Sequence, residues 1–382
     1  METLSPDEQF MKRALDLAEK GLGAVEPNPA VGAVIVKDGK VIGEGYHEKF
    51  GGAHAEINAL ADCRNNSFDP AGGVMYVTLE PCCHAGKTGP CTDAIIDAKI
   101  GKVVAAIVDP CVHASGKGFD KLRKAGVEVQ TGVCAEQGTV INAPFIKFAK
   151  TSRPWVILKW AQSIDAKVAY SDTIRQRQWI SSEQSRKDVH RLRRQVGAIL
   201  VGINTVIADD PQLTARPSKG NKATRIVLDG NLRIPLDCKL LATAKKVPVL
   251  ILTNQQALRE NPQIAEKITQ NGAQVLACPE EEGRSNLHFL TCELAKRGVA
   301  QLLIEGGPTV IASFLKEELV DQIVVYIAPK ILGGSGSAAI TEPMAELTEA
   351  VGLHHVEIER FGDDVRLTGL SKKAFDEISI CP

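Results

Sequence analysis

The sequence predicts an α/β protein of two domains, and three observations lead to this prediction. The 382 residues are too many for one ordinary domain. Apolar strands alternate with helices and loops in both halves of the chain. Arg153-Pro154 interrupts the pattern, and a second α/β pattern begins at Trp155. We therefore expect a first domain over residues 1–150, a second over 151–370 and a tail over 371–382.

Composition and charge indicate a globular protein that acts on small molecules. Hydrophobic residues make up 44% of the chain, charged residues 24%, and the formal net charge is −1. The absence of a basic excess argues against a nucleic-acid partner. No apolar run approaches the ~20 residues of a membrane span, and the first twenty residues predict an amphipathic helix rather than a signal peptide. Ten cysteines without a dense framework favour a reducing cytoplasm.

The elements of the first half follow from cap, turn and periodicity signals. Ser5-Pro6-Asp7-Glu8 has the cap, proline and capping-box glutamate of a helix start, and Gly21 and Gly23 end this helix. Asp38-Gly39 predicts a hairpin turn between two strands. The ranges expected in chain order are strands 31–36 and 41–47, helix 54–63, strand 74–79, helix 92–99, strand 103–108, strand 127–130 and helix 135–150.

The second half predicts another α/β layer. Expected strands cover 156–161, 198–201, 225–228, 247–252, 301–304 and 322–327. Expected helices cover 182–195, 287–297 and 309–316. We interpret 204–214 as a turn-rich loop after a strand, and 216–224 and 278–285 as surface loops.

A candidate metal site is spread between His54 and Cys91. One histidine and two cysteines are three zinc ligands, which leaves the fourth tetrahedral position to a water. The second ligand can be Cys82 or Cys83, and His84 can also coordinate a metal. We favour Cys82 because it directly follows Pro81, within the turn before the loop.

Glu56, two residues after His54, is the expected proton carrier. Zinc lowers the pKa of a bound water towards ~7, so hydroxide is available at neutral pH. Glu56 would take the proton and pass it to a ring nitrogen and to the leaving ammonia. A lone His-Ala-Glu triplet is typical of a surface helix, but this order of residues between two strand–helix units matches the signature of zinc deaminases.

The first half resembles the bifunctional riboflavin-biosynthesis deaminase–reductase family. The residues that carry the resemblance are Pro27-Asn28-Pro29, His47, His54-Ala55-Glu56 and the stretch from Thr78 to Cys91. The long loop between the cysteines differs from the short Cys-x-x-Cys of nucleoside and tRNA deaminases. The resemblance implies deamination of 2,5-diamino-6-(5-phosphoribosylamino)pyrimidin-4(3H)-one to 5-amino-6-(5-phosphoribosylamino)uracil.

The resemblance also implies roles for individual residues of this half. Zinc would be held by His54, Cys82 and Cys91, with Glu56 as proton shuttle. Asn28 and His47 would lie near the pyrimidine. His84 and Lys87 would lie near the ribose phosphate.

In the second half, Glu305-Gly306-Gly307-Pro308-Thr309 follows a strand and opens a helix. Glycines let backbone N–H groups approach an anion at a helix N-terminus. The usual Gly-x-Gly-x-x-Gly fingerprint of dinucleotide binding is missing from this half. The segment therefore predicts a phosphate-containing cofactor, without identifying it.

Four segments of this half resemble the reductase half of the same family. They are 158–165, 178–182, 204–214 and 305–309. The resemblance implies a dihydrofolate-reductase-like domain that follows a cytidine-deaminase-like three-layer domain. It also implies NADPH as the cofactor that reduces the ribosyl chain to ribityl, and self-association of the chain.

The residues implied for the reductase site form two sets. The NADPH set is Ala161, Trp179, Thr205, Asp209, Gly307, Pro308 and Thr309. The set that faces the sugar phosphate is Arg193, Leu213, Arg216 and Glu305. Arg177, which departs from the family pattern, is expected either to add a phosphate contact or to alter affinity. Glu305 and Asp209 are the acidic candidates for a proton donor.

Two positions depart from the family pattern. Ala166 stands where the family usually has glycine, and Arg177 stands where a small polar residue is common. Three other functions compete with the main one. They are a deaminase with a degenerate reductase half, a nucleoside or tRNA base deaminase, and a binding module with a structural zinc.

Overall fold

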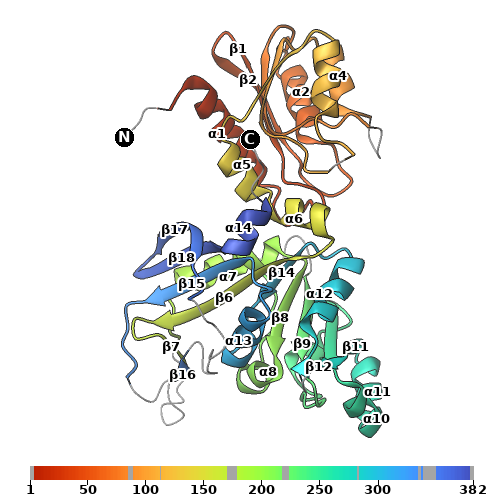
Figure 1. Cartoon of the computed structure of the whole chain (residues 1–382), viewed down its shortest axis with the longest axis vertical. Coiled ribbons are helices and arrows are strands. Elements are labelled where there is room, and N and C mark those ends of the chain that lie inside the picture. The colour runs from red at the N-terminus through yellow and green to blue at the C-terminus, as the bar shows by residue number, and fades with distance from the viewer. Residues whose placement is uncertain are drawn as a thin grey trace. The chain divides into compact units, whose positions relative to one another are not determined.

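The computed structural model describes residues 4–84, 89–111, 113–169, 179–216, 223–281, 284–333, 337–338 and 350–378. Its internal contacts divide the chain between Ser152 and Arg153, and we describe the N-terminal and C-terminal units separately (Figure 1). Within the described residues, every helix is too short or too polar to cross a membrane.

A five-stranded sheet of order β2-β1-β3-β4-β5 forms the centre of the N-terminal unit. Strand β1 is antiparallel to β2 and β3, whereas β3, β4 and β5 are parallel. The strands are β1 Gly32–Lys37, β2 Lys40–Tyr46, β3 Val74–Leu79, β4 Lys102–Ile107 and β5 Glu128–Thr131. The helices are α1 Pro6–Glu19, α2 Ala55–Asn65, α3 Cys91–Asp97, α4 Lys117–Lys124, α5 Ala135–Ile141 and α6 Ala143–Thr151.

Helices α1 and α2 cover opposite faces of this sheet. A Cβ added to Gly32 would lie 2.0 Å from the carbonyl oxygen of Ala14 in α1. A Cβ on Gly45 would lie 2.4 Å from the backbone nitrogen of Ala59 in α2. Gly45 pairs with Ala33, and neighbouring strand residues such as Gly32 and Ala33 face opposite sides. The expected three-layer arrangement follows from these contacts.

Two glycines of β2 let α2 approach the strand closely. A Cβ on Gly43 would lie 2.4 Å from the Cys63 sulfur, and one on Gly45 would meet the backbone of Ala59 at the same distance. Real Cβ atoms do not come this near to other heavy atoms, so α2 packs on bare backbone. This matters for the site, because α2 begins directly after His54.

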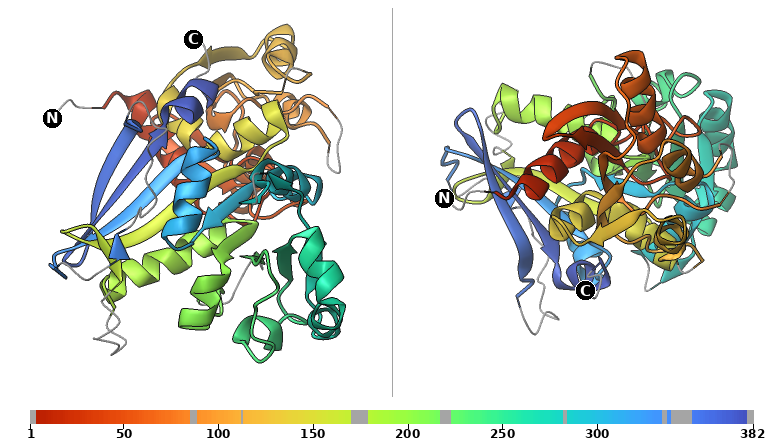
Figure 2. Two further views of the ribbon diagram at one scale, coloured as in Figure 1. Left: turned by 60° about the horizontal axis from the view of Figure 1, so that its bottom comes forward. Right: turned by 90° about the horizontal axis from the view of Figure 1, so that it is seen from above.

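The C-terminal unit has a nine-stranded sheet of order β11-β10-β9-β8-β14-β6-β15-β18-β17. Strands β6, β8 to β11, β14 and β15 are parallel, and β18 and β17 continue the sheet as an antiparallel hairpin, blue in Figure 2. The bounds of the sheet strands are β6 Trp155–Ser163, β8 Ala198–Gly202, β9 Thr224–Leu228, β10 Val249–Thr253, β11 Gln274–Ala277, β14 Gln301–Ile304, β15 Gln322–Ala328, β17 Leu353–Phe361 and β18 Asp364–Ser371.

Two short strand pairs and eight helices complete the described part of this unit. The pairs are β7 Lys167–Ala169 with β16 Ser337–Ala338, and β12 Glu280–Glu281 with β13 Arg284–Ser285. The helices are α7 Glu183–Gln195, α8 Ile203–Asp209, α9 Lys239–Ala242, α10 Gln255–Glu260, α11 Pro262–Gln270, α12 Leu287–Lys296, α13 Pro308–Lys316 and α14 Lys372–Ile378. Apolar strand residues such as Leu200, Leu250 and Leu302 form one core with Leu290 and Phe314 of the helices.

Several local expectations were wrong. The single helix over 135–150 is two helices, because Asn142 leaves helical geometry and its buried side chain accepts a hydrogen bond from the backbone of Ala30. The loop over 204–214 begins with α8, and 278–285 contains the β12–β13 pair. Strands β17 and β18 and helices α10 and α11 were not expected. The segment expected as a tail contains α14.

Candidate active sites

The candidate zinc ligands lie at the starts of two helices and in the loop after β3. His54 is the N-cap residue of α2, and Cys91 is the first residue of α3. Cys82 follows β3 by three residues. The positive end of a helix dipole favours a thiolate, so the position of Cys91 suits a metal ligand.

The three ligand atoms converge on one point. His54 Nδ1 lies 3.5 Å from the sulfur of Cys82 and 3.3 Å from the sulfur of Cys91, and all three atoms lie within 4.8 Å of one another. A tetrahedral zinc with Zn–S of about 2.3 Å and Zn–N of about 2.0 Å holds nitrogen and sulfur about 3.5 Å apart. The donor set therefore fits zinc in both chemistry and spacing.

The described residues bring three metal ligands together and no fourth. Cys83 and His84 are outside the group of ligand atoms, and the side chain of His84 is exposed. Lys87 lies outside the described residues. Among the described residues, the site is an open three-ligand set rather than a closed four-ligand cage.

Glu56 is a buried carboxyl in the first turn of α2, beside these ligands. Its side chain is 3% exposed, and burial raises its pKa to about 7. General acid–base catalysis works best when the pKa of the catalytic group lies near the working pH. Glu56 is therefore suited to accept a proton and return it.

The hydrogen bonds of His47 fix the orientation of the Asn28 amide. His47 Nδ1 lies 2.9 Å from the carbonyl oxygen of Ala53, which can only accept, so Nδ1 carries the hydrogen. Burial lowers the pKa of His47 and favours the neutral ring, whose Nε2 then accepts from Asn28 Nδ2 at 3.2 Å. The carbonyl oxygen of Asn28 remains as an acceptor. The rings of His47 and His54 meet edge to face at 5.3 Å.

In the C-terminal unit, Glu305, Arg193 and Lys159 form a largely buried cluster. Glu305 follows β14, Lys159 lies in the neighbouring β6, and Arg193 comes from α7. Arg193 Nε and Nη2 donate to the two oxygens of Glu305 at 2.6 and 3.0 Å, and Lys159 Nζ lies 3.5 Å from Oε2. Glu305 lies at the carboxyl end of the parallel strand β14, and such strand ends are the usual place for a ligand in an open α/β sheet.

Burial and charge act in opposite directions on this cluster. Burial would raise the pKa of Glu305, but the positive charges of Arg193 and Lys159 outweigh it and lower the pKa to about 2. Burial lowers the pKa of Lys159, and the charge of Glu305 offsets only part of this shift. Sequence reasoning gave Lys159 no role, although a lysine within an apolar strand was a signal that could have singled it out.

The residues predicted to face the sugar phosphate differ in their contacts and in their exposure. Arg193 also donates to the carbonyl oxygen of Thr214 at 3.3 Å, which brings the loop after α8 to the cluster. Leu213 is 3% exposed and has a φ of 49°. Arg216 is exposed and donates to Gln212. Arg177 lies outside the described residues.

Part of the predicted cofactor set meets at the start of α13. Gly307 is the N-cap residue of this helix, and Pro308 and Thr309 are its first residues. The hydroxyl oxygen of Thr205 in α8 lies 3.8 Å from the position of a Cβ on Gly307. A bare backbone and a hydroxyl at a helix N-terminus suit a phosphate.

The remaining cofactor candidates lie in β6, at the end of α8 and at the surface. Ala161 lies in β6, two residues after Lys159, and Asp209 is the last residue of α8. The side chain of Trp179 is 66% exposed, with the Arg186 guanidinium 4.9 Å from its ring centre.

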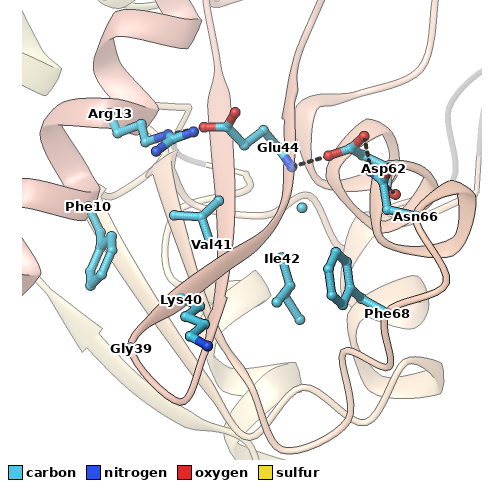
Figure 3. A pocket seen from close by; sticks show the side chains of 11 residues that line it. Phe10, Arg13, Gly39, Lys40, Val41, Ile42, Glu44, Asp62, Asn66 and Phe68 are labelled. Atoms are coloured by element: carbon cyan, nitrogen blue, oxygen red, sulfur yellow. Dashed lines mark hydrogen bonds and ion pairs between the residues drawn. The ribbon is translucent and has the colours of Figure 1, made fainter.

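A surface groove elsewhere on the N-terminal unit carries no argument for a site. It is lined by β2 and by residues of α1 and α2 (Figure 3). Three of its charged residues are engaged with one another, because Arg13 pairs with Glu44 and the backbone N–H of Glu44 donates to Asp62 at 3.0 Å. None of the predicted site residues lines the groove.

Comparison with known families matches both halves of the chain. The cytidine and deoxycytidylate deaminase zinc-binding region matches residues 4–107, and the RibD C-terminal domain matches residues 154–367. The riboflavin biosynthesis protein RibD of Aquifex aeolicus is 44% identical over 361 residues, which cover 94% of this chain and 97% of the relative. RibD of Escherichia coli is 38% identical over 365 residues, or 94% and 98% of the two chains.

Two solved structures are similar over almost the whole chain. RibD of Acinetobacter baumannii is 33% identical, with a TM-score of 0.80 and coverage of 96% of this chain and 99% of that one. The diaminohydroxyphosphoribosylaminopyrimidine deaminase/5-amino-6-(5-phosphoribosylamino)uracil reductase of Thermotoga maritima is 34% identical, with a TM-score of 0.80 and the same coverage.

Proposed function

This chain belongs to the RibD family of riboflavin-biosynthesis proteins, and from this membership we propose how its residues carry out two reactions. It is a bifunctional enzyme with a cytidine-deaminase-like domain followed by a reductase domain, as the sequence predicted. It deaminates 2,5-diamino-6-(5-phosphoribosylamino)pyrimidin-4(3H)-one and then reduces the ribosyl chain of the product to ribityl. The enzyme uses zinc and a nicotinamide cofactor.

For the deaminase, we propose that His54, Cys82 and Cys91 hold the zinc. When bound, the zinc supplies a hydroxide at neutral pH. Glu56 takes one proton of the attacking water and delivers it to the ring nitrogen, and it then carries the second proton to the amino group, which leaves as ammonia. The observation that supports this assignment is a buried carboxyl in the first turn of α2, beside three converging ligands.

We propose that the amide of Asn28 orients the pyrimidine and that His47 holds this amide. The hydrogen bond from Asn28 Nδ2 to His47 leaves the asparagine oxygen to accept from the pyrimidine edge. His84 and Lys87 are proposed contacts of the ribose phosphate. The exposure of His84 is consistent with this role.

For the reductase, we propose NADPH as the hydride donor to C1′ of the open or imine form of the sugar. Gly307, Pro308, Thr309 and Thr205 would contact its phosphates. The proposed further contacts are Ala161, Trp179 and Asp209 for NADPH, and Arg177, Leu213 and Arg216 for the sugar phosphate.

The Glu305–Arg193–Lys159 cluster is the proposed binding and proton-transfer site of the reductase substrate. Two cations and one anion leave one net positive charge, which suits a phosphorylated sugar. Lys159 is the proposed proton donor of this cluster, because burial already lowers its pKa. The pKa of Glu305, about 2, leaves its carboxylate ionised, so Glu305 is not retained as a donor.

One assay tests both halves of the proposal. The diaminopyrimidine ribotide is supplied with and without NADPH, while ammonia and the absorbance of the reduced nicotinamide are followed. We expect ammonia in both cases and NADPH oxidation that starts only after deamination. Ammonia without NADPH oxidation would instead support a deaminase with a degenerate reductase half. NADH in place of NADPH tests the choice of cofactor.

Location and assembly are further proposals. Thiolate ligands suit a reducing compartment, and no disulfide joins the cysteines of the described residues, so we propose a cytoplasmic location. We also propose a homo-oligomer. The exposed Val356 and Ile358 on the edge strand β17 support it, and light scattering measures it.

A further inference from the structure

A buried carboxylate lies immediately before the second zinc ligand. Glu80 follows β3, is 5% exposed, and is separated from Cys82 by Pro81 alone. Its Oε1 accepts hydrogen bonds from the backbone N–H groups of Gly118 at 2.8 Å and Phe119 at 3.4 Å. Its Oε2 accepts from two more backbone N–H groups. These belong to Asp109 at 3.1 Å and Gly116 at 2.9 Å.

Three of these four donors belong to the start of helix α4. Gly116 is its N-cap residue, and Gly118 and Phe119 lie in its first turn. The first N–H groups of a helix have no partner within the helix, and its dipole favours an anion there. Glu80 therefore caps α4 from a distant point in the sequence.

Glycine at 118 allows α4 to lie directly on the chain before the ligand. A Cβ at this position would be 2.2 Å from the carbonyl oxygen of Pro81 and 3.0 Å from Glu80 Oε1. Any larger residue must push α4 and the Glu80–Pro81 backbone apart. The capping carboxylate and this contact hold the same two residues.

Cys82 is held from the other side by α3. Its carbonyl oxygen accepts from the backbone of Thr92 at 3.1 Å, and its sulfur accepts from the backbone N–H of Cys91 at 3.4 Å. The second ligand thus lies between a segment bound to α3 and a segment bound to α4. Pro81, with its fixed φ, leaves little freedom between Glu80 and Cys82.

We propose that Glu80 is a positioning residue of the zinc site, which fixes Cys82 by binding the start of α4. The carboxylate touches neither the metal nor the substrate, and it acts through the backbone of residues 80–82. This inference rests on the proposed zinc ligands. Residues that orient metal ligands in this way commonly change metal affinity about 10- to 100-fold when they are replaced.

The test compares Glu80→Gln with a matched control in the C-terminal unit. An amide keeps one accepting oxygen, and its nitrogen would face two N–H donors. Asp229→Asn makes the same change in a buried carboxylate that accepts from the backbone of Arg233 at 2.9 Å and Ile234 at 2.8 Å. Gly118→Ala is a second test variant, because it separates α4 from Pro81 while the carboxylate remains.

The measurement is the rate at which the zinc-loaded full-length protein transfers its metal to a chelating dye. We expect Glu80→Gln and Gly118→Ala to release zinc about tenfold faster than the wild type, or more. Asp229→Asn should match the wild type. Thermal unfolding of the metal-free proteins separates this effect from a general loss of stability.

Different results would refute the proposed zinc ligands and the proposed positioning role of Glu80. Wild-type protein without one bound zinc would refute the proposed ligands. Wild-type zinc release by Glu80→Gln would refute the positioning role, even if its unfolding temperature falls. If Glu80→Gln does not fold, Gly118→Ala decides the question by the same criterion.

Discussion

Both carboxylate oxygens of Glu305 accept hydrogen bonds from the guanidinium of Arg193, at 2.6 and 3.0 Å. Sequence reasoning assigned both residues to the substrate phosphate, but it did not pair them with each other. The ammonium of Lys159, 3.5 Å from the same carboxylate, makes the cluster cationic. A phosphate would therefore meet positive groups that are already held in place.

The ion pairs of Glu305 should make the C-terminal unit sensitive to acid. The pKa of Glu305 is about 2 in the folded protein and near its ordinary value of 4.5 in the unfolded chain. The pairs therefore stabilise fully above pH 4.5, and their contribution of about 3 kcal/mol is lost as the pH falls towards 2. Glu305→Gln should remove this part of the pH dependence. All three tryptophans lie in the C-terminal unit, so their fluorescence during denaturant unfolding measures it.

Lys159→Met should abolish the second reaction and spare the first. The variant keeps most of the apolar stem but loses the buried ammonium beside Glu305. We expect NADPH oxidation to fall about 100-fold or more, with ammonia release unchanged. Lys296→Met, at an exposed lysine of α12, is the control. Unchanged NADPH oxidation in Lys159→Met would exclude the ammonium from the reaction.

Glu56→Gln should stop ammonia release while zinc stays bound. An amide cannot carry the proton, and a loss of about 10²- to 10⁴-fold is usual for such a group. Metal analysis and an ammonia assay test the two parts separately. Supply of the deaminated intermediate should still give NADPH oxidation, which shows that the protein is folded. Full ammonia release would reject the shuttle role.

The adjacent cysteines provide a matched pair of variants. Cys82 contributes its sulfur to the ligand group, and Cys83 does not. We expect Cys82→Ser to purify with little zinc and no deaminase activity, and Cys83→Ser to retain both. The reverse result would assign the second ligand to Cys83.

Ala166→Gly should stabilise the C-terminal unit. Ala166 has a φ of 58°, in the left-handed region where an L-residue is strained by about 1–2 kcal/mol and glycine is not. The greater freedom of glycine in the unfolded chain offsets part of the gain, so about 0.5–1 kcal/mol should remain. Ala265→Gly, inside α11, should destabilise by about 1 kcal/mol. Denaturant unfolding followed by tryptophan fluorescence measures both.

The group of three proposed zinc ligands could be predicted because residue types and their order in the sequence are enough to indicate it. Histidine and cysteine are common metal ligands, and the order of His54, Cys82 and Cys91 along the chain indicates a single metal site. The four partners of Glu80 could not be predicted, because they are backbone N–H groups of residues 109–119 and leave no trace in side-chain chemistry.

The strands of the nine-stranded sheet also differed in how well they could be predicted. Buried parallel strands such as β8 and β14 read as apolar runs, and the sequence predicted them closely. Strand β17 was missed because its side chains are largely exposed and include His354, Glu357 and Glu359. An exposed edge strand lacks the hydrophobic pattern on which such predictions depend.

Because α2 packs directly on the backbone of Gly43 and Gly45, substitutions at these two glycines should affect the deaminase. A methyl group at either position would act as a wedge beneath the helix and tilt the end that bears His54 and Glu56. The damage would fall on hydrolysis of the amino group, although neither glycine has a side chain that could take part in it. Random substitutions that silence this half should therefore be found in β2 as well as among the reacting groups.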